Sequence, residues 1–402
     1  MYHISRSCFL CLARRTHHES NSYLCLARRT YHESNSCFLC LARKMYHESN
    51  STLLIKRIFR KIMGQTLSEP VTAKKLACCR NSNYRVGSSC MQGWRIKMED
   101  CHVHILSLPD DPGSAFFAVY DGHGGAAMAQ HAGKHLHEYI TRRSEYKAGN
   151  IVQAIQQGFL ELDKAMQNDA ALKDEQAGTT VIALLIKDNI IYSANAGDSR
   201  AVASINGNAV PLSRDHKPTL KDERERIEIG GGWVEFNRVN GQLALSRALG
   251  DFMFKRNERK PPQEQIVTAF PEVQEFRITE DWEFVVLACD GIWDVMTSNE
   301  VVNFIRTRLV QSKFGIGEEQ DTMDPEEICE ELMKHCLAPD ALMGTGCDNM
   351  TVILVCFLHG KPYSHLISRC KESIVSNNGQ EVSKYKYSNN FSKMQQIFVQ
   401  SP

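Results

Sequence analysis

Acidic residues border strongly apolar runs at three places in this 402-residue sequence. Asp121 follows FFAVY and opens DGHGG, Asp290 follows EFVVLAC and opens DGIWD, and Asp348 lies just before TVILVCFL. The pair Glu99–Asp100 adds two more carboxylates. A single Asp-Gly dipeptide is usually only a turn signal. Carboxylates at the ends of three buried strands would instead crowd together, which is stable only if hard cations such as Mg²⁺ or Mn²⁺ neutralise them.

Short apolar and β-branched runs predict the strands that must place these carboxylates. The runs cover residues 180–187, 190–194, 201–205, 209–212, 283–289 and 351–358. Asn206-Gly207, between two of the runs, is a hairpin signal. The last two runs are apolar throughout, which is typical of fully buried strands. Neighbouring strands joined by short turns favour antiparallel sheets over a βαβ array.

Helices are predicted from apolar spacing and from capping residues. One buried helical face is expected from residues at helical spacing: Ile151, Ile155, Phe159, Leu162 and Met166. Thr297 with Glu300 forms a capping box before VVNFIRTRLV, and Asp324-Pro325 with Glu327 begins another helix. Because helices and strands are grouped separately, we predict an α+β fold in which helices flank antiparallel sheets.

Residues 8–51 are three near-copies of one unit: CFLCLARRTHHESNS, YLCLARRTYHESNS and CFLCLARKMYHESNS. The apolar part, CFLCLA, is too short to build a core. The Cys-x-x-Cys pairs of the first and third copies suggest zinc, but the middle copy keeps only Cys25 and no C-x-x-C…H-x-x-x-H spacing recurs. A basic, acid-poor start is also typical of a mitochondrial presequence, although the repetition and the HESNS acids weigh against one. We expect residues 1–62 to be a disordered or untranslated extension.

Charge and cysteine content narrow the protein class. Formal net charge is zero, although residues 1–62 carry eleven basic and three acidic residues. This balance gives no indication of nucleic-acid binding. Fifteen cysteines, an odd number scattered along the chain and partly inside apolar runs, indicate free thiols in a reducing compartment. No apolar stretch approaches the roughly eighteen residues that span a bilayer. We expect a cytoplasmic protein, with the nucleus as a second candidate compartment.

A lipid anchor is suggested by the run Met63-Gly64-Gln65-Thr66-Leu67-Ser68. It fits the N-myristoylation pattern M-G-x-x-x-[ST], provided that translation starts at Met63. One myristoyl chain gives marginal, reversible membrane binding, so only a minor membrane-associated fraction is expected. The predicted organisation is an N-terminal segment at 63–84, a continuously folded domain at 85–358 and a flexible tail at 359–402, where Ser, Asn, Lys and Gln dominate.

Nine motifs occur in order over residues 87–355: GSSCMQGWRIKMED, FFAVYDGHGG, GTT, NAGDSRAV, HKP, GGWV, RVNGQLALSRALGD, VVLACDGIWDV and CDNMTVILV. This ordered set resembles the type 2C family of metal-dependent Ser/Thr protein phosphatases. The resemblance covers the whole region expected to fold. It implies an α-β-β-α sandwich of two antiparallel sheets, with metal ions at one end. Departures are small, since Cys101 and Gly230 stand where the family usually has alanine, and neither change removes a ligand.

The resemblance implies a ligand set for two Mg²⁺ or Mn²⁺ ions. Asp121 would bridge both metals. Asp290 and Asp348 would complete the first site, and Glu99 with the backbone carbonyl of Gly122 would complete the second.

Further residues take on roles by the same resemblance. Asp100 would orient metal-bound water, Arg95 would bind the substrate phosphate, and His123 would protonate the leaving oxygen. Asp198 and Asp294, together with Asp290, resemble a weaker third metal site.

The implied function is signalling dephosphorylation. Phosphoserine and phosphothreonine of phosphoprotein substrates would be hydrolysed by in-line attack of a hydroxide that bridges the two metals. We expect a monomer that needs no nucleic-acid partner.

Other readings of the sequence fit less well. A cysteine-nucleophile phosphatase could use His335-Cys336, but residues 337–342 contain no arginine to bind phosphate. A serine hydrolase fails because Gly197-Asp198-Ser199 lacks the second glycine of G-x-S-x-G. The alternative from another class is a catalytically inactive binding module or scaffold on the phosphatase fold. A lost ligand would mark such a protein, and every ligand position is kept.

Overall fold

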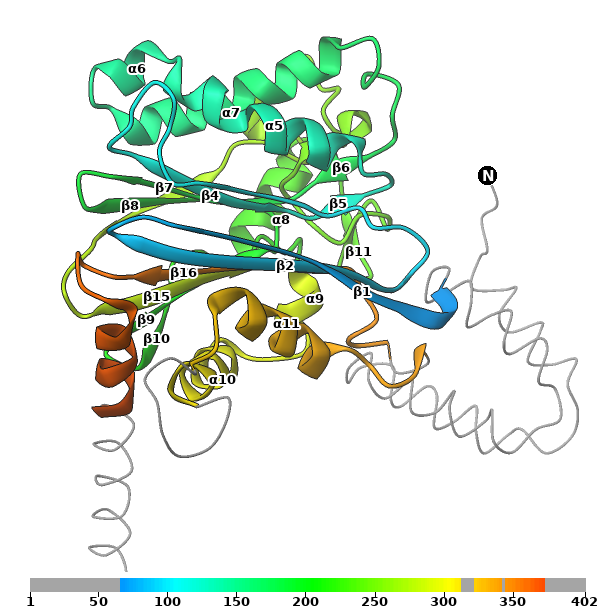
Figure 1. Cartoon of the computed structure of the whole chain (residues 1–402). Helices are drawn as coiled ribbons and strands as arrows, with labels where there is room; N and C mark the ends of the chain where they lie inside the picture. Colours follow the sequence, from blue (N-terminus) through cyan, green and yellow to red (C-terminus); the bar gives the residue numbers. More distant parts are fainter. Residues whose placement is uncertain (1–65, 312–321, 342–343, 373–402) are drawn as a thin grey trace, which may run out of the picture. The chain divides into compact units, whose positions relative to one another are not determined.

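The computed structural model describes residues 66–311, 322–341 and 344–372 (Figure 1). The repeats at 8–51, the myristoylation pattern before Thr66 and the end of the chain beyond residue 372 lie outside the described residues. From Thr66 onward the chain forms one compact unit. No helix among the described residues is both long and apolar enough to cross a membrane.

Two antiparallel sheets form the centre of this unit. The first has six strands, in the order β1 (Thr66–Arg80), β2 (Tyr84–Arg95), β16 (Met350–Phe357), β15 (Trp282–Ala288), β9 (Arg200–Ile205) and β10 (Asn208–Pro211). The second has five, in the order β14 (Glu272–Arg277), β8 (Ile190–Ala196), β7 (Val181–Lys187), β4 (Ala115–Tyr120) and β3 (Cys101–Ile105).

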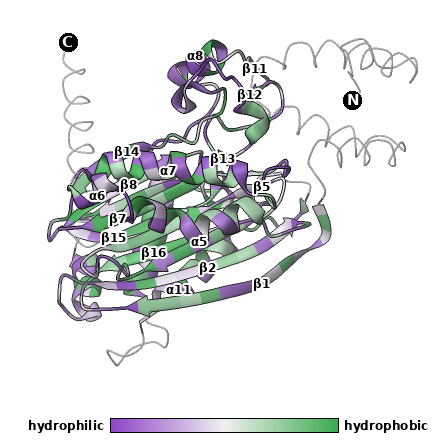
Figure 2. Cartoon of the chain, turned by 90° about the horizontal axis from the view of Figure 1, so that it is seen from above, coloured by the Kyte–Doolittle hydropathy of each residue, from purple (hydrophilic) through white to green (hydrophobic). Residues whose placement is uncertain are grey.

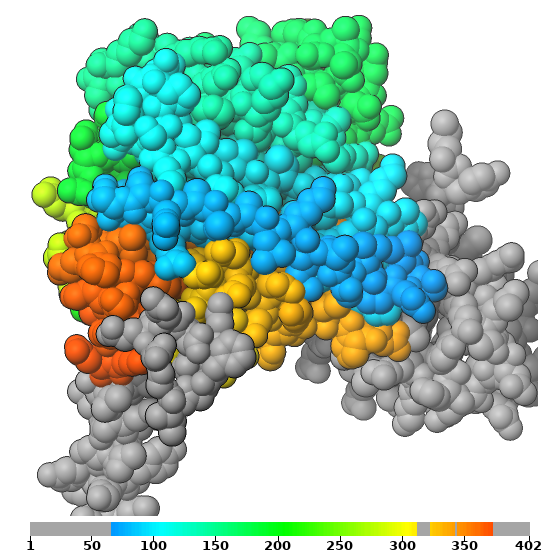
Figure 3. Space-filling model, in the orientation of Figure 1, coloured from blue at the N-terminus to red at the C-terminus, as the bar shows by residue number. Residues whose placement is uncertain are grey.

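Helices cover the outer face of each sheet, as Figure 1 shows. The five-stranded sheet carries α5 (Ala127–Thr141), α6 (Ser144–Lys147) and α7 (Ile151–Asn168). The six-stranded sheet carries α9 (Asp290–Trp293), α10 (Ser298–Val310) and α11 (Pro325–Cys336). In the space-filling view the N-terminal strands, in blue, run directly alongside these last helices, in yellow and orange (Figure 3). The predicted α-β-β-α sandwich is confirmed.

A small lobe stands beside the sandwich (Figure 2). It contains α8 (Lys221–Ile229), β11 (Val234–Glu235) and β12 (Arg238–Val239), and the 3₁₀ turns η1 (Phe252–Phe254) and η2 (Pro262–Glu264) follow along the chain. A separate cluster of buried residues around Ile227, Val239 and Phe254 gives this lobe its own core.

Strand alternation explains why the central strands are apolar on both sides. Successive side chains of a strand point to opposite faces. Phe116 of β4 packs under the helices α5 and α7, whereas Phe117 packs between the sheets. Val285 of β15 also lies between the sheets, and Val286 faces α10 and α11. Three hydrophobic layers therefore need strands with no polar face.

The structure confirms the predicted helix face, hairpin turn and helix starts. The face predicted for residues 151–166 is buried in α7. Asn206 and Gly207 both have positive φ, 48° and 79°, as a hairpin turn between β9 and β10 requires. Both capping boxes form, with Thr297 at the start of α10 and Asp324 at the start of α11.

The folded region extends beyond the predicted domain, 85–358, at both ends. The strand β1 begins at Thr66, so most of the segment assigned to 63–84 belongs to the six-stranded sheet. At the other end, residues 363–372 are helical, and Leu366, Ile367 and Cys370 are buried. A flexible tail starting at 359 is therefore wrong for these ten residues.

Candidate active site

The two sheets bring the predicted carboxylates to one end of the sandwich. Asp100 directly precedes β3 and Asp121 directly follows β4, and these strands pair so that Cys101 lies opposite Tyr120. Asp290 follows β15 and Asp348 precedes β16, and those strands also pair antiparallel. Ligand-type atoms of Asp100, Asp121 and Cys289 lie within 4.8 Å of one another. Antiparallel pairing thus gathers side chains that are far apart in the sequence.

The carboxyl groups of this cluster are buried close together, which makes them hard to ionise. Asp100 Oδ2 accepts a hydrogen bond from Thr351 Oγ1 at 2.7 Å, but its buried Oδ1 has no protein partner. Burial raises the pKa of Asp100 to about 7, in spite of the Thr351 hydrogen bond. Burial and neighbouring carboxylates raise the pKa values of Asp121 and Asp290 well above the ordinary range. Buried, unpartnered carboxylate oxygens fit hard divalent cations, which would supply the missing charge.

Gly122 and Glu99 lie side by side at the same site. A Cβ on Gly122 would lie 2.3 Å from the backbone oxygen of Glu99, so only glycine allows this approach. The Glu99 amide donates to Asn349 Oδ1 at 2.8 Å. The Asn349 side chain also donates to the carbonyls of Gln92 and Lys97, at 2.8 and 3.0 Å. Asn349 therefore joins the loop before β3 to the loop before β16.

Arg95 lies at the open side of the cluster. Its guanidinium forms an ion pair with Asp348, and 48% of its side chain is exposed. Burial lowers the pKa of Arg95, but the charge and hydrogen bond of Asp348 more than offset this and raise it overall. Asp348 holds the guanidinium at the mouth of the site, where a fork of N–H groups could meet an incoming anion.

Lysine occupies the neighbourhood of the predicted third metal site. Asp198 is 2% exposed and forms an ion pair with Lys217, while its Oδ1 has no partner. Asp290 and Asp294 are also close enough to Lys217 to raise its pKa, against the lowering effect of burial. Asp294 ends α9 and is exposed. The structure thus brings the three predicted carboxylates together, with an ammonium among them.

His123 lies beside the cluster, in contact with a second acid. Its Nε2 lies 2.7 Å from Asp251 Oδ2. Burial lowers the pKa of His123, but the Asp251 carboxylate outweighs it, so the pKa is raised. The Asp251 carboxylate therefore favours the protonated form of the imidazole.

Sequence reasoning missed several residues of this site: Lys217, Asp251, Cys289, Asn349 and Thr351. All five lie inside the nine motifs, so membership of a motif could have marked them as candidates. The neighbouring sequence does not show which side chains each one contacts. Burial raises the pKa of the Cys289 thiol well above its usual value, which keeps it protonated within the carboxylate cluster.

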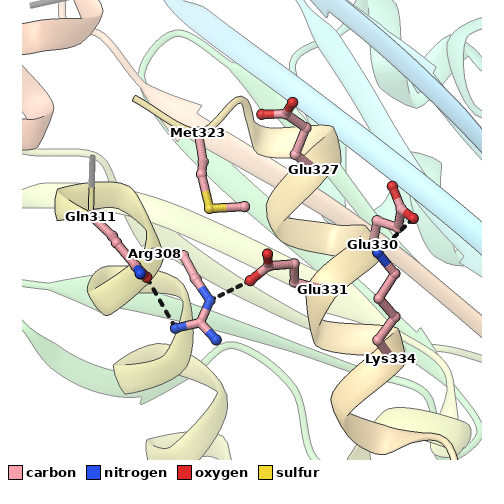
Figure 4. A pocket seen from close by; sticks show the side chains of 7 residues that line it. All are labelled: Arg308, Gln311, Met323, Glu327, Glu330, Glu331 and Lys334. Atoms are coloured by element: carbon pink, nitrogen blue, oxygen red, sulfur yellow. Dashed lines mark hydrogen bonds and ion pairs between the residues drawn. The ribbon is translucent and has the colours of Figure 1, made fainter. Parts of the chain in front are cut away.

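A separate hollow of about 440 Å³ lies between α10 and α11 (Figure 4). Its charged side chains are already matched, because Glu330 pairs with Lys334 at 2.9 Å and Glu331 pairs with Arg308. It shares no lining residue with the carboxylate cluster. We therefore assign the chemistry to the cluster at the end of the sheets.

Comparison with known proteins identifies the family and the fold. A model of the family described as Protein phosphatase 2C matches residues 84–342, which is more than half of the chain. This chain belongs to the protein phosphatase 2C family. A probable protein phosphatase 2C of Caenorhabditis elegans is 58% identical over 314 residues, covering 78% of this chain and 85% of the relative. Protein phosphatase 2C homolog 2 of Hypocrea jecorina is 44% identical over 326 residues, 79% of this chain and 72% of the relative.

Solved structures agree on the fold of this protein phosphatase 2C member. A phosphatase from a pathogenic strain of Toxoplasma gondii aligns with a TM-score of 0.59 at 27% identity, over 71% of this chain and 96% of that one. A sex-determining protein of C. elegans gives the same TM-score at 24% identity, over 73% of this chain and 68% of that one. The chain is a protein phosphatase, and its substrates are phosphoproteins.

Proposed function

We propose that this phosphatase hydrolyses phosphoserine and phosphothreonine with two divalent cations, Mg²⁺ or Mn²⁺, held by the carboxylate cluster. The observation that carries the proposal is the buried group of Asp100, Asp121 and Asp290. Burial raises their pKa values and neighbouring carboxylates add to the rise, so bound cations would stabilise the ionised forms. The intact cluster also argues against an inactive scaffold on the same fold.

The residues that would hold the cations come from both sheets. Asp121 would contact both ions, Asp290 and Asp348 the first, and Glu99 with the carbonyl of Gly122 the second. When bound, such a pair of ions lowers the pKa of water and neutralises charge on the phosphoryl oxygens.

We also propose a third metal site that binds its ion more weakly than the other two. Asp198 and Asp294, with Asp290, would hold an ion there, and Lys217 would have to give up its ion pair with Asp198 to admit it.

The other side chains act directly on substrate and water. Arg95, anchored by Asp348, would bind the phosphate oxygens with its remaining N–H groups. Asp100, with one oxygen fixed by Thr351, would accept a hydrogen bond from the attacking water through the other. His123 uses Nε2 to contact Asp251, so its Nδ1–H is the group that would protonate the departing serine or threonine oxygen.

The decisive experiment follows hydrolysis of a phosphothreonine peptide by the purified chain. We expect turnover with added Mg²⁺ or Mn²⁺ and none in excess chelator. The Asp121→Asn variant should be inactive at the metal concentration that saturates the parent protein. Asp111→Asn is the matched control, because Asp111 pairs with Lys187 at the opposite end of β4. Full activity in chelator would refute the metal-dependent mechanism, and inactivity of the parent protein under all metal conditions would favour the scaffold.

We further propose a monomer that works in the cytoplasm and the nucleus, with a minor fraction held at membranes by myristate on Gly64. Support comes from the thiols, since no disulfide joins the described cysteines, as expected in a reducing compartment. Gly64 itself lies outside the described residues.

A further inference from the structure

We propose that Asp251 is a positioning residue that fixes the imidazole of His123 for proton donation, and that Asp163 of α7 holds the loop that carries Asp251. This inference rests on the proposed function, in which His123 protonates the leaving oxygen. It assigns a task to Asp251, which no motif argument had singled out.

A three-stranded sheet sets the distance between the two side chains. It consists of β5 (Gly122–His123), β6 (Gly178–Thr179) and β13 (Leu249–Gly250), with β6 in the middle. His123 and Gly250 both lie opposite Gly178, on either side of it. Asp251 follows directly, and its amide donates to the carbonyl of Ala177 at 2.9 Å. The register of the small sheet therefore places Asp251 one residue beyond the position that faces His123 across β6.

The contact between the two side chains passes over Gly178. A Cβ on Gly178 would lie 2.3 Å from Asp251 Oδ2 and 2.6 Å from His123 Nε2. Any side chain at this position would push the pair apart. Asp251 itself has φ 51°, a left-handed conformation that few residues other than Gly, Asn and Asp adopt easily. Backbone and glycine together thus make room for this one carboxylate.

Asp163 anchors the Asp251 loop from the other side. Asp163 Oδ1 accepts from the Gly250 amide at 2.8 Å, and both of its oxygens accept from Lys255 Nζ at 2.7 and 2.8 Å. Lys255 also donates to the carbonyl of Ala248 at 2.8 Å. The Asp163 and Lys255 side chains are only 13% and 7% exposed. The loop on both sides of Asp251 is therefore tied to the rigid helix α7.

The arrangement suits a positioning role because the two partners differ in exposure. The Asp251 side chain is 7% exposed, whereas that of His123 is 29% exposed. The carboxylate is thus buried behind the ring, and the ring keeps an exposed edge that a substrate could reach. An imidazole without this contact could turn about its two side-chain bonds, and only part of the population would hold Nδ1–H toward the leaving oxygen.

The test is a double-mutant cycle on two substrates. Asp251→Gly removes the carboxylate without backbone strain at φ 51°, and His123→Ala removes the group it is meant to position. Each single variant and the double variant are assayed on a phosphothreonine peptide and on p-nitrophenyl phosphate, whose leaving group departs without a proton. We expect Asp251→Gly to lower kcat on the peptide by about 10- to 100-fold, less than the roughly 10²–10⁴-fold that the general acid itself contributes. Its KM should hardly change, and the loss on p-nitrophenyl phosphate should be much smaller.

The coupling between the two substitutions shows whether Asp251 positions His123 or only supports the fold. If Asp251 acts through His123, adding Asp251→Gly to His123→Ala should cause no further loss. Additive losses, or equal losses on both substrates, would overturn the proposal. Asp163→Asn should give a weaker version of the same substrate-dependent pattern, and Asp111→Asn should give none. Melting temperatures of all variants show whether they are folded, and Asp251→Asn, which keeps the left-handed conformation, replaces the glycine variant if that one unfolds.

The proposed function and this inference fail in different ways. Absence of metal-dependent turnover in the parent protein would refute the function, and the positioning role with it. A selective loss in His123→Ala but not in Asp251→Gly would leave the function standing and refute the positioning role alone.

Discussion

Replacing Asp100 by asparagine should stabilise the metal-free protein while it harms the enzyme. The carboxyl pKa rises from 3.8 to about 7 on folding, mainly through burial. Between these two pH values the folded state binds more protons than the unfolded state, so stability falls as pH rises through this range. A shift of about 3 units corresponds to ~4 kcal/mol at pH 7.5.

The measurable gain in the free energy of unfolding should be about half of that value. Asp121 and Asp290 interact with the same charge, so part of the relief is shared among the three carboxyls. About 2 kcal/mol in a domain of roughly 300 residues corresponds to a rise in Tm of about 3 °C. Asparagine keeps an oxygen that can accept from Thr351 Oγ1, so the hydrogen bond at 2.7 Å need not be lost.

The assay compares thermal melts of Asp100→Asn and the parent protein in excess chelator. We expect the variant to melt higher at pH 7.5, with the difference shrinking by roughly half at pH 5.5, because the parent carboxyl is then largely protonated in the fold. Histidines such as His102, whose pKa burial lowers to about 4, destabilise both proteins alike at low pH and cancel in the difference. With saturating Mn²⁺ the difference should shrink, since bound ions would neutralise the buried charge of the parent protein. An equal or lower Tm for the variant at pH 7.5 in chelator would refute the prediction that the ionised, buried Asp100 carboxylate destabilises the metal-free fold.

Four further outcomes are expected. Asp121→Asn should weaken Mn²⁺ binding, measured by calorimetry, by at least about 100-fold, whereas Asp198→Asn should affect only the weakest site; equal affinities would contradict the bridging role. A chain of residues 63–402 should match the specific activity of the full chain, and lower activity would show that the extension belongs to the enzyme. Gly64→Ala should abolish any membrane-bound fraction on cell fractionation, and a persistent fraction would exclude myristate as its cause. Deleting the helix at 363–372, together with everything after it, should lower the stability by at least about 3 kcal/mol in denaturant melts; an unchanged midpoint would mean that the helix adds nothing to the core.

Sequence patterns predicted the elements whose burial is simple. The strands β15 and β16 lie between two hydrophobic layers, so both faces must be apolar and the run is unmistakable. The helix α7 has one buried face and shows the matching period. Edge strand β1 escaped notice because TLSEPVTAKKLACCR is mostly exposed and has no clear alternation. It is a strand because it pairs with β2, which is a tertiary cause and leaves little local trace.

The residues of the candidate site also differ in how well sequence patterns could predict them. The carboxylates could be predicted because each one stands at the end of a recognisable strand or inside a motif. The contact of His123 with Asp251 could not, because it joins residues 128 positions apart through the register of a sheet with two-residue strands. No hydrophobic period marks strands of that length.

The pairing of β2 with β16 has a consequence for the protein during its synthesis. Residues 84–95 lie beside residues 350–357, so the six-stranded sheet cannot close until nearly the whole chain has been translated. Asp121 leaves the ribosome early, whereas Asp348 follows more than two hundred residues later. Contacts of such long sequence separation form slowly, after the loop entropy has been overcome. A nascent or prematurely terminated chain therefore holds only part of the carboxylate cluster, and we expect phosphatase activity to arise only once the last strand has paired.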